Sequence, residues 1–420
     1  MEDFISNLPN EILFYIISSL PFESAKQTIF LSERWRLLWK TALVQHGTEE
    51  NFVTTICNFL ANFNEQDPLK NTRKFQFHFI NGNISLAIVA PNNELHLDFS
   101  TGKKEFDRQF KLQLDFNNNL AGRPSLSTIR SLNLISVNHL TNKAVSLILS
   151  KFQSLETLKI RNCNCLQSLS IGSDTKLLSF TIFDCPQLEF LTVRCFKLKT
   201  FRFRGLLPSI WLDYHYNLVD AFLDFRQGPM RSSFTNQDLD SVLLTIKNVK
   251  VLTVCKWTFK TFICPWLSTF LAEFQFYGLK ELWWIDNLNQ EYDSQALMSF
   301  LKLCPSLERL FVTIDPKSYC VEKITSCSTE VAGRNTKLKH LKLVKLDGFV
   351  NQEDEILLAQ HLGEIVTTEP LILASAVGIS LRKLINDPFY QQKQKRKSNY
   401  IFVEVKDMNQ LCLKHVHMVL

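Results

Sequence analysis

The chain has 420 residues, of which 45% are hydrophobic, and its 47 Lys and Arg against 41 Asp and Glu give a formal net charge of +6. This composition argues against disorder and allows a large core or several domains. The basic residues are spread along the chain, which argues against nucleic-acid binding. Eleven cysteines without a C-x-x-C pair, and acidic Glu2 and Asp3 at the start, predict an intracellular protein with reduced thiols, no signal peptide and no membrane span.

Three short helices are predicted over the first 43 residues. The first follows Leu8-Pro9, because proline is well placed near a helix start, and it ends at Leu20-Pro21. Ser24 to Leu31 and Ser32 to Leu43 suit the second and third helices. These segments hold more large apolar side chains than three short helices can bury, and an exposed apolar patch usually marks a partner site. A helical cap on a larger core is the alternative interpretation.

The order of residues in this segment resembles the F-box of plant F-box/leucine-rich-repeat proteins. The matching positions are Asp3, Ile5, Ser6, Leu8-Pro9, Glu11-Ile12-Leu13, Ile16, Leu20-Pro21, Ala25, Thr28, Leu31-Ser32, Arg34-Trp35 and Leu38-Trp39. The resemblance implies docking on a Skp-type adaptor, which tethers the chain to a cullin and a RING subunit. The adaptor contacts that it implies are Leu8, Pro9, Ile12, Leu13, Ile16, Leu20, Pro21, Leu31 and Trp35. Phe22 and Glu33 depart from the common pattern, at variable positions.

A repeat follows farther along the chain. The triad apolar-x-x-apolar-x-apolar occurs ten times between residues 129 and 343, and from Leu155 to Leu198 its successive starts lie 11, 11, 11 and 10 residues apart. Each triad ends in period-two alternation, which predicts a short strand with one buried face. A leucine-rich repeat runs ~20–29 residues, so a step of 11 is half a coil. Cys163 and Cys185 occupy the Asn/Cys position of alternate triads. We therefore predict coils of about 22 residues with an extended segment on each side.

Later triads are about 30 residues apart, which leaves room for a helix in each coil. Asp238 to Ile246 and Ser294 to Leu303 have the helical pattern. Upstream of the repeat, alternating segments are interpreted as early, degenerate coils that follow a helix. These segments are Phe75–Phe79, Leu95–Phe99 and Phe110–Leu114, after a helix at Val53–Phe63. A hairpin closed by Asn81-Gly82 is the alternative for the first of them.

The outward-facing residues of the middle coils are the candidate target site. Residues one coil apart become neighbours on adjacent strands, so Arg161, Phe183 and Arg204 are expected to line up. A basic, partly aromatic stripe suits an acidic partner segment through charge-assisted Arg contacts. A solvated strand face is the alternative. The candidate target-binding residues are Lys159, Arg161, Phe183, Arg194, Arg202 and Arg204.

The sequence pattern changes from Gly348 onward, after the last of the apolar triads. An acidic cluster at residues 351–355 precedes an apolar helical run from Ile356 to Val366, and acidic residues suit a helix N-terminus. Strands are predicted at Leu371–Leu373 and Ile401–Val403. A solenoid needs a cap on its last coil, and this region supplies one. The order helix, Glu369-Pro370, strand resembles the FBD-type extension of plant F-box/leucine-rich-repeat proteins.

Few other sequence motifs suggest a targeting signal, a metal site or a catalytic function. A basic run, Lys393–Lys397, is either an exposed loop or a nuclear localisation signal. The group Cys412-x-x-His415-x-His417 offers three ligands without a fourth, so we predict no structural zinc site. Glycine-rich nucleotide loops, H-E-x-x-H and G-x-S-x-G are all absent from the sequence, so we predict neither an enzyme nor a cofactor.

The sequence therefore predicts an α/β repeat protein with an N-terminal three-helix F-box, a leucine-rich-repeat solenoid and a C-terminal α/β cap. The predicted boundaries are 1–46 for the F-box, 47–125 for the degenerate coils, 126–347 for the solenoid and 348–420 for the cap. The predicted role is substrate recognition in a Skp-cullin-F-box ubiquitin ligase, in the nucleus, the cytoplasm or both, with an unidentified target protein. A small-molecule-sensing receptor and a ligase-independent scaffold are the alternatives.

Overall fold

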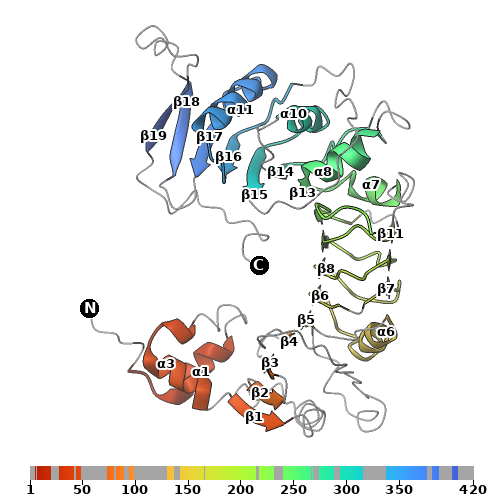
Figure 1. Cartoon of the computed structure of the whole chain (residues 1–420), viewed down its shortest axis with the longest axis vertical. Helices are drawn as coiled ribbons and strands as arrows, with labels where there is room; N and C mark the ends of the chain where they lie inside the picture. The colour runs from red at the N-terminus through yellow and green to blue at the C-terminus, as the bar shows by residue number, and fades with distance from the viewer. Residues whose placement is uncertain are drawn as a thin grey trace. The chain divides into compact units, whose positions relative to one another are not determined.

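The computed structural model describes residues 5, 7–19, 28–41, 44–48, 73–79, 82–88, 94–98, 130–136, 142–164, 166–213, 217–230, 240–265, 267, 274–287, 294–315, 337–375, 381–386 and 400–404 (Figure 1). The chain divides into two compact units. The first holds residues 1–217 with 230–233, and the second holds residues 218–229 with 234–420.

The N-terminal helices of the first unit are α1 (Asn10–Ser19), the 3₁₀ turn η1 (Thr28–Phe30) and α3 (Glu33–Thr41). Their apolar core contains Leu13, Trp35 and Leu38. Ser32 accepts a hydrogen bond from the Trp35 amide at 3.4 Å, as a helix N-cap does. Helices α1 and α3 coincide with the first and third predicted helices within a few residues. Of the predicted second helix, only the last turn falls within the described residues.

The next strands of this unit are β1 (Val44–Thr48), β2 (Arg73–Phe79), β3 (Gly82–Ile88) and β4 (Glu94–Asp98). Strands β2 and β3 are antiparallel with Phe79 opposite Gly82, so the hairpin alternative is the one observed for this pair. Strands β1 and β2 are parallel, and β4 is parallel to β5 (Ser131–Ile135). The predicted helix at 53–63 and strand at 110–114 lie outside the described residues.

The repeat coils follow the helix α6 (Asn142–Lys151). The parallel strands β6 (Thr157–Arg161), β8 (Ser179–Phe183) and β10 (Thr200–Arg204) extend the sheet of β5, and they begin 22 and 21 residues apart. The strands β7 (Ser168–Ile171), β9 (Phe190–Val193) and β11 (Ser209–Leu212) form a second, three-stranded parallel sheet. Figure 1 shows the two sheets on opposite sides of the coils. The predicted coil, with an extended segment on each side, is confirmed.

We call the sheet that contains β5, β6, β8 and β10 the main sheet. The turns after β6, β8 and β10 show how each coil closes. Asn162 and Asp184 have φ values of 52° and 55°, and Gly205 takes the same place after β10 with φ 141°. Asn, Asp and Gly are the residues that adopt such backbone most readily. The thiols of Cys163 and Cys185 then donate to the last carbonyls of β6 and β8, at 3.4 and 3.6 Å. Both cysteines are buried, so they belong to the core of the coils.

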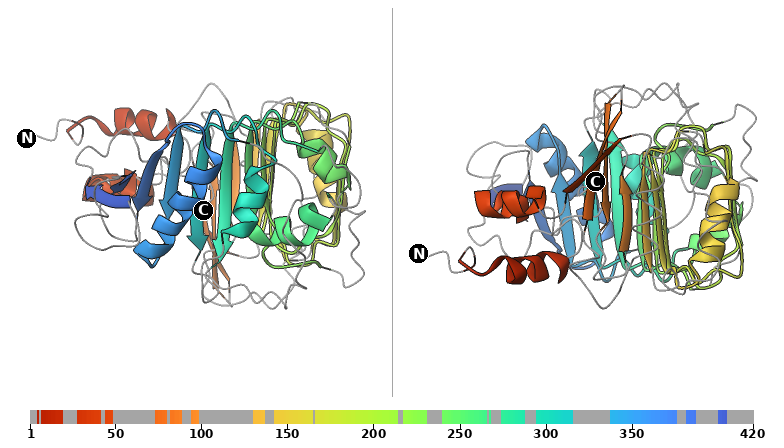
Figure 2. Two further views of the ribbon diagram at one scale, coloured as in Figure 1. Left: turned by 90° about the horizontal axis from the view of Figure 1, so that it is seen from above. Right: turned by 90° about the horizontal axis from the view of Figure 1, so that it is seen from below.

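The second unit begins with the parallel strands β12 (Asp220–Asp224), β13 (Val251–Cys255), β14 (Glu281–Asn287), β15 (Arg309–Asp315), β16 (Leu343–Asp347) and β17 (Leu371–Ser375), which pair in that order. Two antiparallel strands, β18 (Arg382–Asn386) and β19 (Tyr400–Glu404), follow at one edge. The connections include α7 (Asp240–Ile246), α10 (Gln295–Leu301) and α11 (Gln352–Ile365). Figure 2 shows these helices on one side of the sheet.

The core of this unit lies between the sheet and the helices. The rings of Trp284 and Phe300 are 5.6 Å apart, and Phe259 meets Phe300 edge to face at 5.4 Å. Phe259 belongs to a connection that the sequence did not predict as helical, a short helix α8 (Lys256–Thr258) continued by the π-helical turn η5 (Phe259–Ile263). Aromatic packing thus joins one helical connection to the next coil.

Strands β13, β14 and β15 and helices α7 and α10 lie where they are predicted, with small shifts at their ends. The last triad predicts a strand that ends at Leu343, whereas β16 begins there and buries Val344 and Leu346, so the predicted strand was about three residues too early. The last helix begins at Gln352 rather than Ile356, so the acidic residues Glu353, Asp354 and Glu355 form its first turn instead of preceding it. Their carboxylates suit the helix dipole there. Strand β18 was not predicted. The basic run at 393–397 and the Cys-His-His group at 412–417 lie outside the described residues.

Candidate interaction surfaces

The N-terminal helices expose large apolar side chains. Ile12 is 47% exposed, Leu31 63% and Phe30 85%, and Ile5 and Leu37 are exposed as well. We call Ile5, Ile12, Phe30, Leu31 and Leu37 the apolar face. Exposed apolar side chains are ordinary when single, but five within 33 residues of a small helical unit are typical of a partner site. The predicted surplus of apolar groups is therefore present on the surface.

The predicted adaptor contacts do not all lie on this surface. Ile12 and Leu31 are exposed, and so is Pro9, whereas Leu8 and Ile16 are half-buried. Leu13 and Trp35 are 0% and 1% exposed, so their assignment as contact residues is corrected to that of core residues. Leu20 and Pro21 lie outside the described residues.

Helical spacing alone did not separate the two groups, because Ile12 and Leu13 are adjacent large apolar residues. Phe30, Ile5 and Leu37 were missed for the same reason.

One polar contact fixes the turn before α1. The Arg34 guanidinium donates from Nη2 to the Leu8 carbonyl oxygen at 2.7 Å and to Asn10 Oδ1 at 2.9 Å. The start of α1 is thereby tied to α3.

In the repeat coils, the candidate target residues form two rows across the main sheet. In one row Lys159 is in register with Thr181, which is in register with Arg202. In the other, Arg161, Phe183 and Arg204 are in register, as predicted. Lys159, Arg161, Arg202 and Arg204 are all half-buried, with part of each side chain reaching solvent. We call these four residues the basic face.

Phe183 does not lie on the surface as expected. It is only 2% exposed, and the guanidinium carbon of Arg204 lies 4.9 Å above the centre of its ring. A long cationic side chain covers an aromatic ring in this way because the ring face carries negative electrostatic potential. The expectation that Phe183 presents an aromatic surface to a target is therefore wrong.

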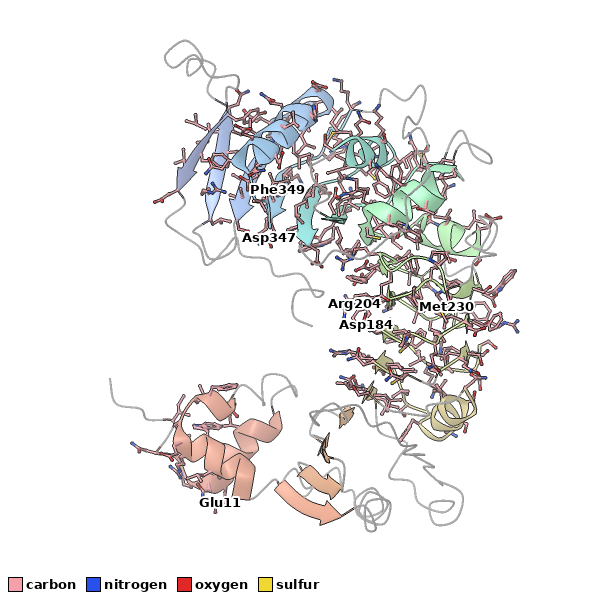
Figure 3. All side chains as sticks on the ribbon, viewed as in Figure 1. Glu11, Asp184, Arg204, Met230, Asp347 and Phe349 are labelled. Atoms are coloured by element: carbon pink, nitrogen blue, oxygen red, sulfur yellow. The ribbon has the colours of Figure 1, made fainter. Side chains whose placement is uncertain are left out.

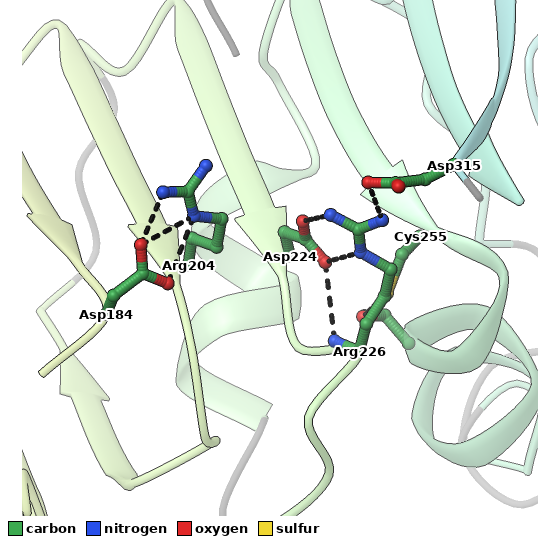
Figure 4. Close-up of polar contacts among 7 residues, drawn as sticks. Asp184, Arg204, Asp224, Arg226, Cys255 and Asp315 are labelled. Carbon is green, nitrogen blue, oxygen red and sulfur yellow. Dashed lines mark hydrogen bonds and ion pairs between the residues drawn. The ribbon is translucent and has the colours of Figure 1, made fainter. Parts of the chain in front are cut away.

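Arg204 also has an acidic partner that the sequence did not indicate. Asp184, the turn residue after β8, accepts hydrogen bonds from Arg204 Nε at 3.1 Å to each carboxylate oxygen and a further bond from Nη2 (Figures 3 and 4). The two side chains are 24% and 29% exposed. This bidentate pair fixes the plane of the guanidinium over the Phe183 ring.

Arg194 is separate from the basic face. It follows β9, a strand of the three-stranded sheet, and its Nε lies 3.9 Å from Asp213 Oδ2. The sequence grouped Arg194 with the other cations because alternation within a triad does not tell which of the two sheets the triad joins. The main sheet and the three-stranded sheet share the same local pattern.

The strand ends of the second unit hold a different charge arrangement. Arg226 donates to both carboxylate oxygens of Asp224 at 2.7 and 2.6 Å, and from Nη1 to Asp315 Oδ2 at 2.6 Å (Figure 4). Burial alone would lower the pKa of the Arg226 guanidinium, but the two carboxylates raise it above its ordinary value. Burial also raises the pKa of the neighbouring Cys255 thiol to about 12. This cluster connects the end of β12 to the end of β15.

Within the part of the chain that the structure describes, no group of three or more His, Cys, Asp or Glu side chains is arranged to hold a metal ion. None of the helices described there has the length and apolar character needed to cross a membrane.

Comparison with known proteins gives the family. The family model described as "At1g61320/AtMIF1, LRR domain" matches residues 108–401, well over half of the chain, and the F-box domain model matches residues 5–44. The chain belongs to the plant F-box/leucine-rich-repeat family. The F-box match covers α1, η1 and α3, and the leucine-rich-repeat match covers the coils of both units.

This F-box/leucine-rich-repeat protein is similar to several proteins of Arabidopsis thaliana. It is 26% identical over 284 residues to "F-box/LRR-repeat protein At5g02910", covering 60% of each chain. It is 28% identical to "F-box/FBD/LRR-repeat protein At5g22700", over 46% of this chain and 41% of the relative. It is 24% identical to "Putative F-box/FBD/LRR-repeat protein At5g56810", over 86% of each. The chain thus covers only about half the length of the first two relatives.

Proposed function

We propose that this protein is the substrate-recognition subunit of a Skp-cullin-F-box ubiquitin ligase. The observation that carries the proposal is the apolar face on a segment that matches the F-box model. Ile12, Phe30 and Leu31 leave much of their apolar surface in contact with water. A Skp-type adaptor would cover this surface. The repeats then present a target protein, and the chain takes no covalent part in ubiquitin transfer.

The proposed mechanism is proximity. A chain that binds the adaptor through one segment and a target through another makes their encounter intramolecular, so the effective concentration of the target near the ligase rises. The cullin and RING subunits would supply the transfer chemistry. In this proposal the chain contributes affinity and orientation, and it acts in the nucleus, the cytoplasm or both.

The proposed domain division keeps a three-helix F-box at 1–46, degenerate coils at 47–125, the solenoid at 126–347 and a cap at 348–420. The cap is supported by contacts at the end of the second unit. Arg382 of β18 lies 3.2 Å from Glu355 of α11, and the Tyr400 hydroxyl of β19 donates to the Ala359 carbonyl at 3.2 Å. These antiparallel strands end the run of parallel coils, as a solenoid cap must.

A pair of exposed substitutions tests adaptor binding without removing core side chains. Ile12→Asp with Leu31→Asp places two charges on the apolar face, where burial against an adaptor would be costly. Trp211→Asp is the matched control, because Trp211 is 58% exposed on the three-stranded sheet. Each tagged full-length variant is purified from plant cells with the proteasome blocked, and co-purifying Skp-type adaptor and cullin are quantified.

The proposal predicts that wild type and Trp211→Asp recover both adaptor and cullin, and that the Ile12/Leu31 variant loses both while it still melts cooperatively. Retention of the adaptor by the Ile12/Leu31 variant would disprove the assigned face. Recovery of the adaptor without any cullin would instead favour a ligase-independent scaffold.

A further inference from the structure

Strand β19 ends the sheet of the second unit, and among the described residues its only pairing partner is β18 (Figure 1). The outer edge of such a strand presents a row of backbone N–H and C=O groups, onto which another strand can pair. Elsewhere the chain protects an edge of this kind. The Ser170 amide on the outer edge of β7 donates to Asn142 Oδ1 of α6 at 2.9 Å.

The side chains of β19 are those of an interior strand. Residues 400–403 are aromatic or aliphatic without a break, and the only charged residue, Glu404, is the last one. A continuous apolar run is typical of a strand with both faces covered, whereas edge strands usually carry lysine or proline. Ile401 and Phe402 are half-buried, and Val403 is 41% exposed. Apolar surface therefore reaches water at an edge where natural strands are normally polar.

This apolar surface lies on both faces of β19. Ile401 is paired with Ile385 of β18, which is 36% exposed, and Val403 shares their face because alternate residues of a strand point the same way. Phe402 points to the opposite face, where the guanidinium carbon of Arg382 lies 4.4 Å from the centre of its ring. A partner that packed on one face would leave the other in water. An added strand would continue the sheet and shield both.

The sequence of β19 is complementary to itself. In an antiparallel pair of two copies centred on Phe402, this residue lies opposite its own equivalent, Ile401 lies opposite Val403, and Tyr400 lies opposite Glu404. A two-fold axis normal to the sheet keeps each side chain on its own face, so apolar groups meet apolar groups. Aromatic and β-branched cross-strand pairs are favourable, and this register places no like charges directly opposite one another.

We propose that the edge of β19 binds a second copy of this chain, as an antiparallel strand pair about a two-fold axis centred on Phe402. The sheets of the two caps would then form one continuous sheet. The inference goes beyond the proposed function and does not depend on it, since no residue of β19 belongs to the apolar face. A dimer carries two sets of repeats, so a target with two recognition sites would bind it more tightly than it binds one chain.

The experiment measures the mass of the full-length protein in reducing buffer by sedimentation equilibrium, over a wide range of concentration. The site variant, Ile401→Lys with Val403→Lys, places cations directly opposite cations in the proposed pair. The swap variant, Ile401→Lys with Val403→Glu, places each cation opposite a carboxylate of the other copy. The matched control, Tyr277→Lys with Val350→Lys, changes two residues outside β19 that are 60% and 73% exposed. Melting temperature and adaptor binding are measured on the same samples.

The proposal predicts that wild type and the control variant are dimers at high concentration and dissociate on dilution. The site variant should dimerise about tenfold or more weakly, because like charges directly opposite one another in a strand pair repel. The swap variant should recover most of the dimer, since opposite charges then meet in the same register. Val403→Lys alone changes one exposed side chain, so it should fold normally and give an intermediate loss.

A wild type that is monomeric at every concentration would overturn the proposal and favour a strand of a different protein at this edge. A site variant that dimerises as tightly as wild type would overturn it too, because another surface would then join the two copies. A swap variant as weak as the site variant would contradict the register, and the proposal with it. Loss of the dimer with the adaptor retained removes this inference alone, and loss of the adaptor from a protein that still dimerises removes the proposed function alone.

Discussion

The strand faces of the two units differ in how they treat charge. In the repeat coils of the first unit, the charged pair that the described residues show on the main sheet is partly exposed, with Arg204 bound to the turn carboxylate Asp184. In the second unit, cations and carboxylates occur in pairs. Arg309 lies 2.6 Å from Glu281, Lys256 lies 3.2 Å from Asp286, and Arg226 bridges two aspartates.

The difference lies in how far water screens each pair. The side chains of Asp224 and Asp286 are each 1% exposed, so an unpaired charge there would be costly. Arg204 and Asp184 remain partly in contact with water, which weakens their attraction. The same leucine-rich coil thus supports buried ion pairs in one unit and a partly exposed pair in the other.

The largest effect is expected from breaking the buried pair. In Arg226→Ala, the Asp224 carboxylate is left buried without its cation, and its side chain is only 1% exposed. We expect a loss of roughly 3–5 kcal/mol in the free energy of unfolding, measured by urea denaturation. Adding Asp224→Asn should restore part of that loss, because an amide costs less to bury than an unpaired charge. A loss in Arg226→Ala no larger than that of an ordinary surface substitution would show that the pair is not structural.

A second charge pair makes the second unit sensitive to pH. Burial raises the pKa of Glu355 to about 7, although Arg382 acts to lower it, and Asp354 adds to the rise. Because the folded-state pKa lies above the ordinary value of 4.5, this group stabilises the fold fully below pH 4.5 and progressively less as the pH rises to 7. Urea denaturation across this range should show the decline, and Glu355→Gln should remove it. An unchanged pH slope in Glu355→Gln would contradict the assignment.

The corresponding pair of the first unit should matter less. Arg204 and Asp184 are each about a quarter exposed, so water screens their attraction. We expect a coupling energy of about 1 kcal/mol in a double-mutant cycle with Arg204→Ala and Asp184→Ala, followed by urea denaturation. A coupling energy as large as the whole loss in Arg226→Ala would erase the distinction between the two units.

The smallest effect concerns thiol reactivity and should leave stability unchanged. A hydrogen bond with Cys163 lowers the pKa of Cys185, whereas burial raises the pKa of Cys255 and Cys304 well above its ordinary value. Since the thiolate is the reactive form, iodoacetamide should label Cys185 faster than the other two in the native protein. Peptide mapping by mass spectrometry measures the three rates. Faster labelling of Cys255 would contradict the difference in environment.

Much of the coil architecture could be predicted from the sequence because it depends on local periodicity. The 11-residue step between triads gave the two strands of each coil, and Cys163 and Cys185 marked where one coil follows the last. The turn η5 and strand β18 could not be predicted in this way. Strand β18 pairs with β17 and β19, and its Arg382 meets Glu355 of α11, and such contacts have no local signature.

The candidate sites were predicted only in part, for a related reason. Register across parallel strands follows from the repeat length, so Arg161, Phe183 and Arg204 could be aligned before the structure was known. Burial depends on what covers a residue. The sequence showed neither that Arg204 lies over Phe183 nor that Ile12 is exposed while Leu13 is not. Adaptor and target binding remain predictions.

The measurement that tests the central claim most directly asks whether the chain binds a Skp-type adaptor through the apolar face. Skp-type adaptor is immobilised, the full-length protein is added, and the amount of protein retained is recorded. We predict that wild type and Trp211→Asp are retained, and that Ile12→Asp with Leu31→Asp abolishes retention. Retention of the Ile12/Leu31 variant at the level of wild type would contradict the account.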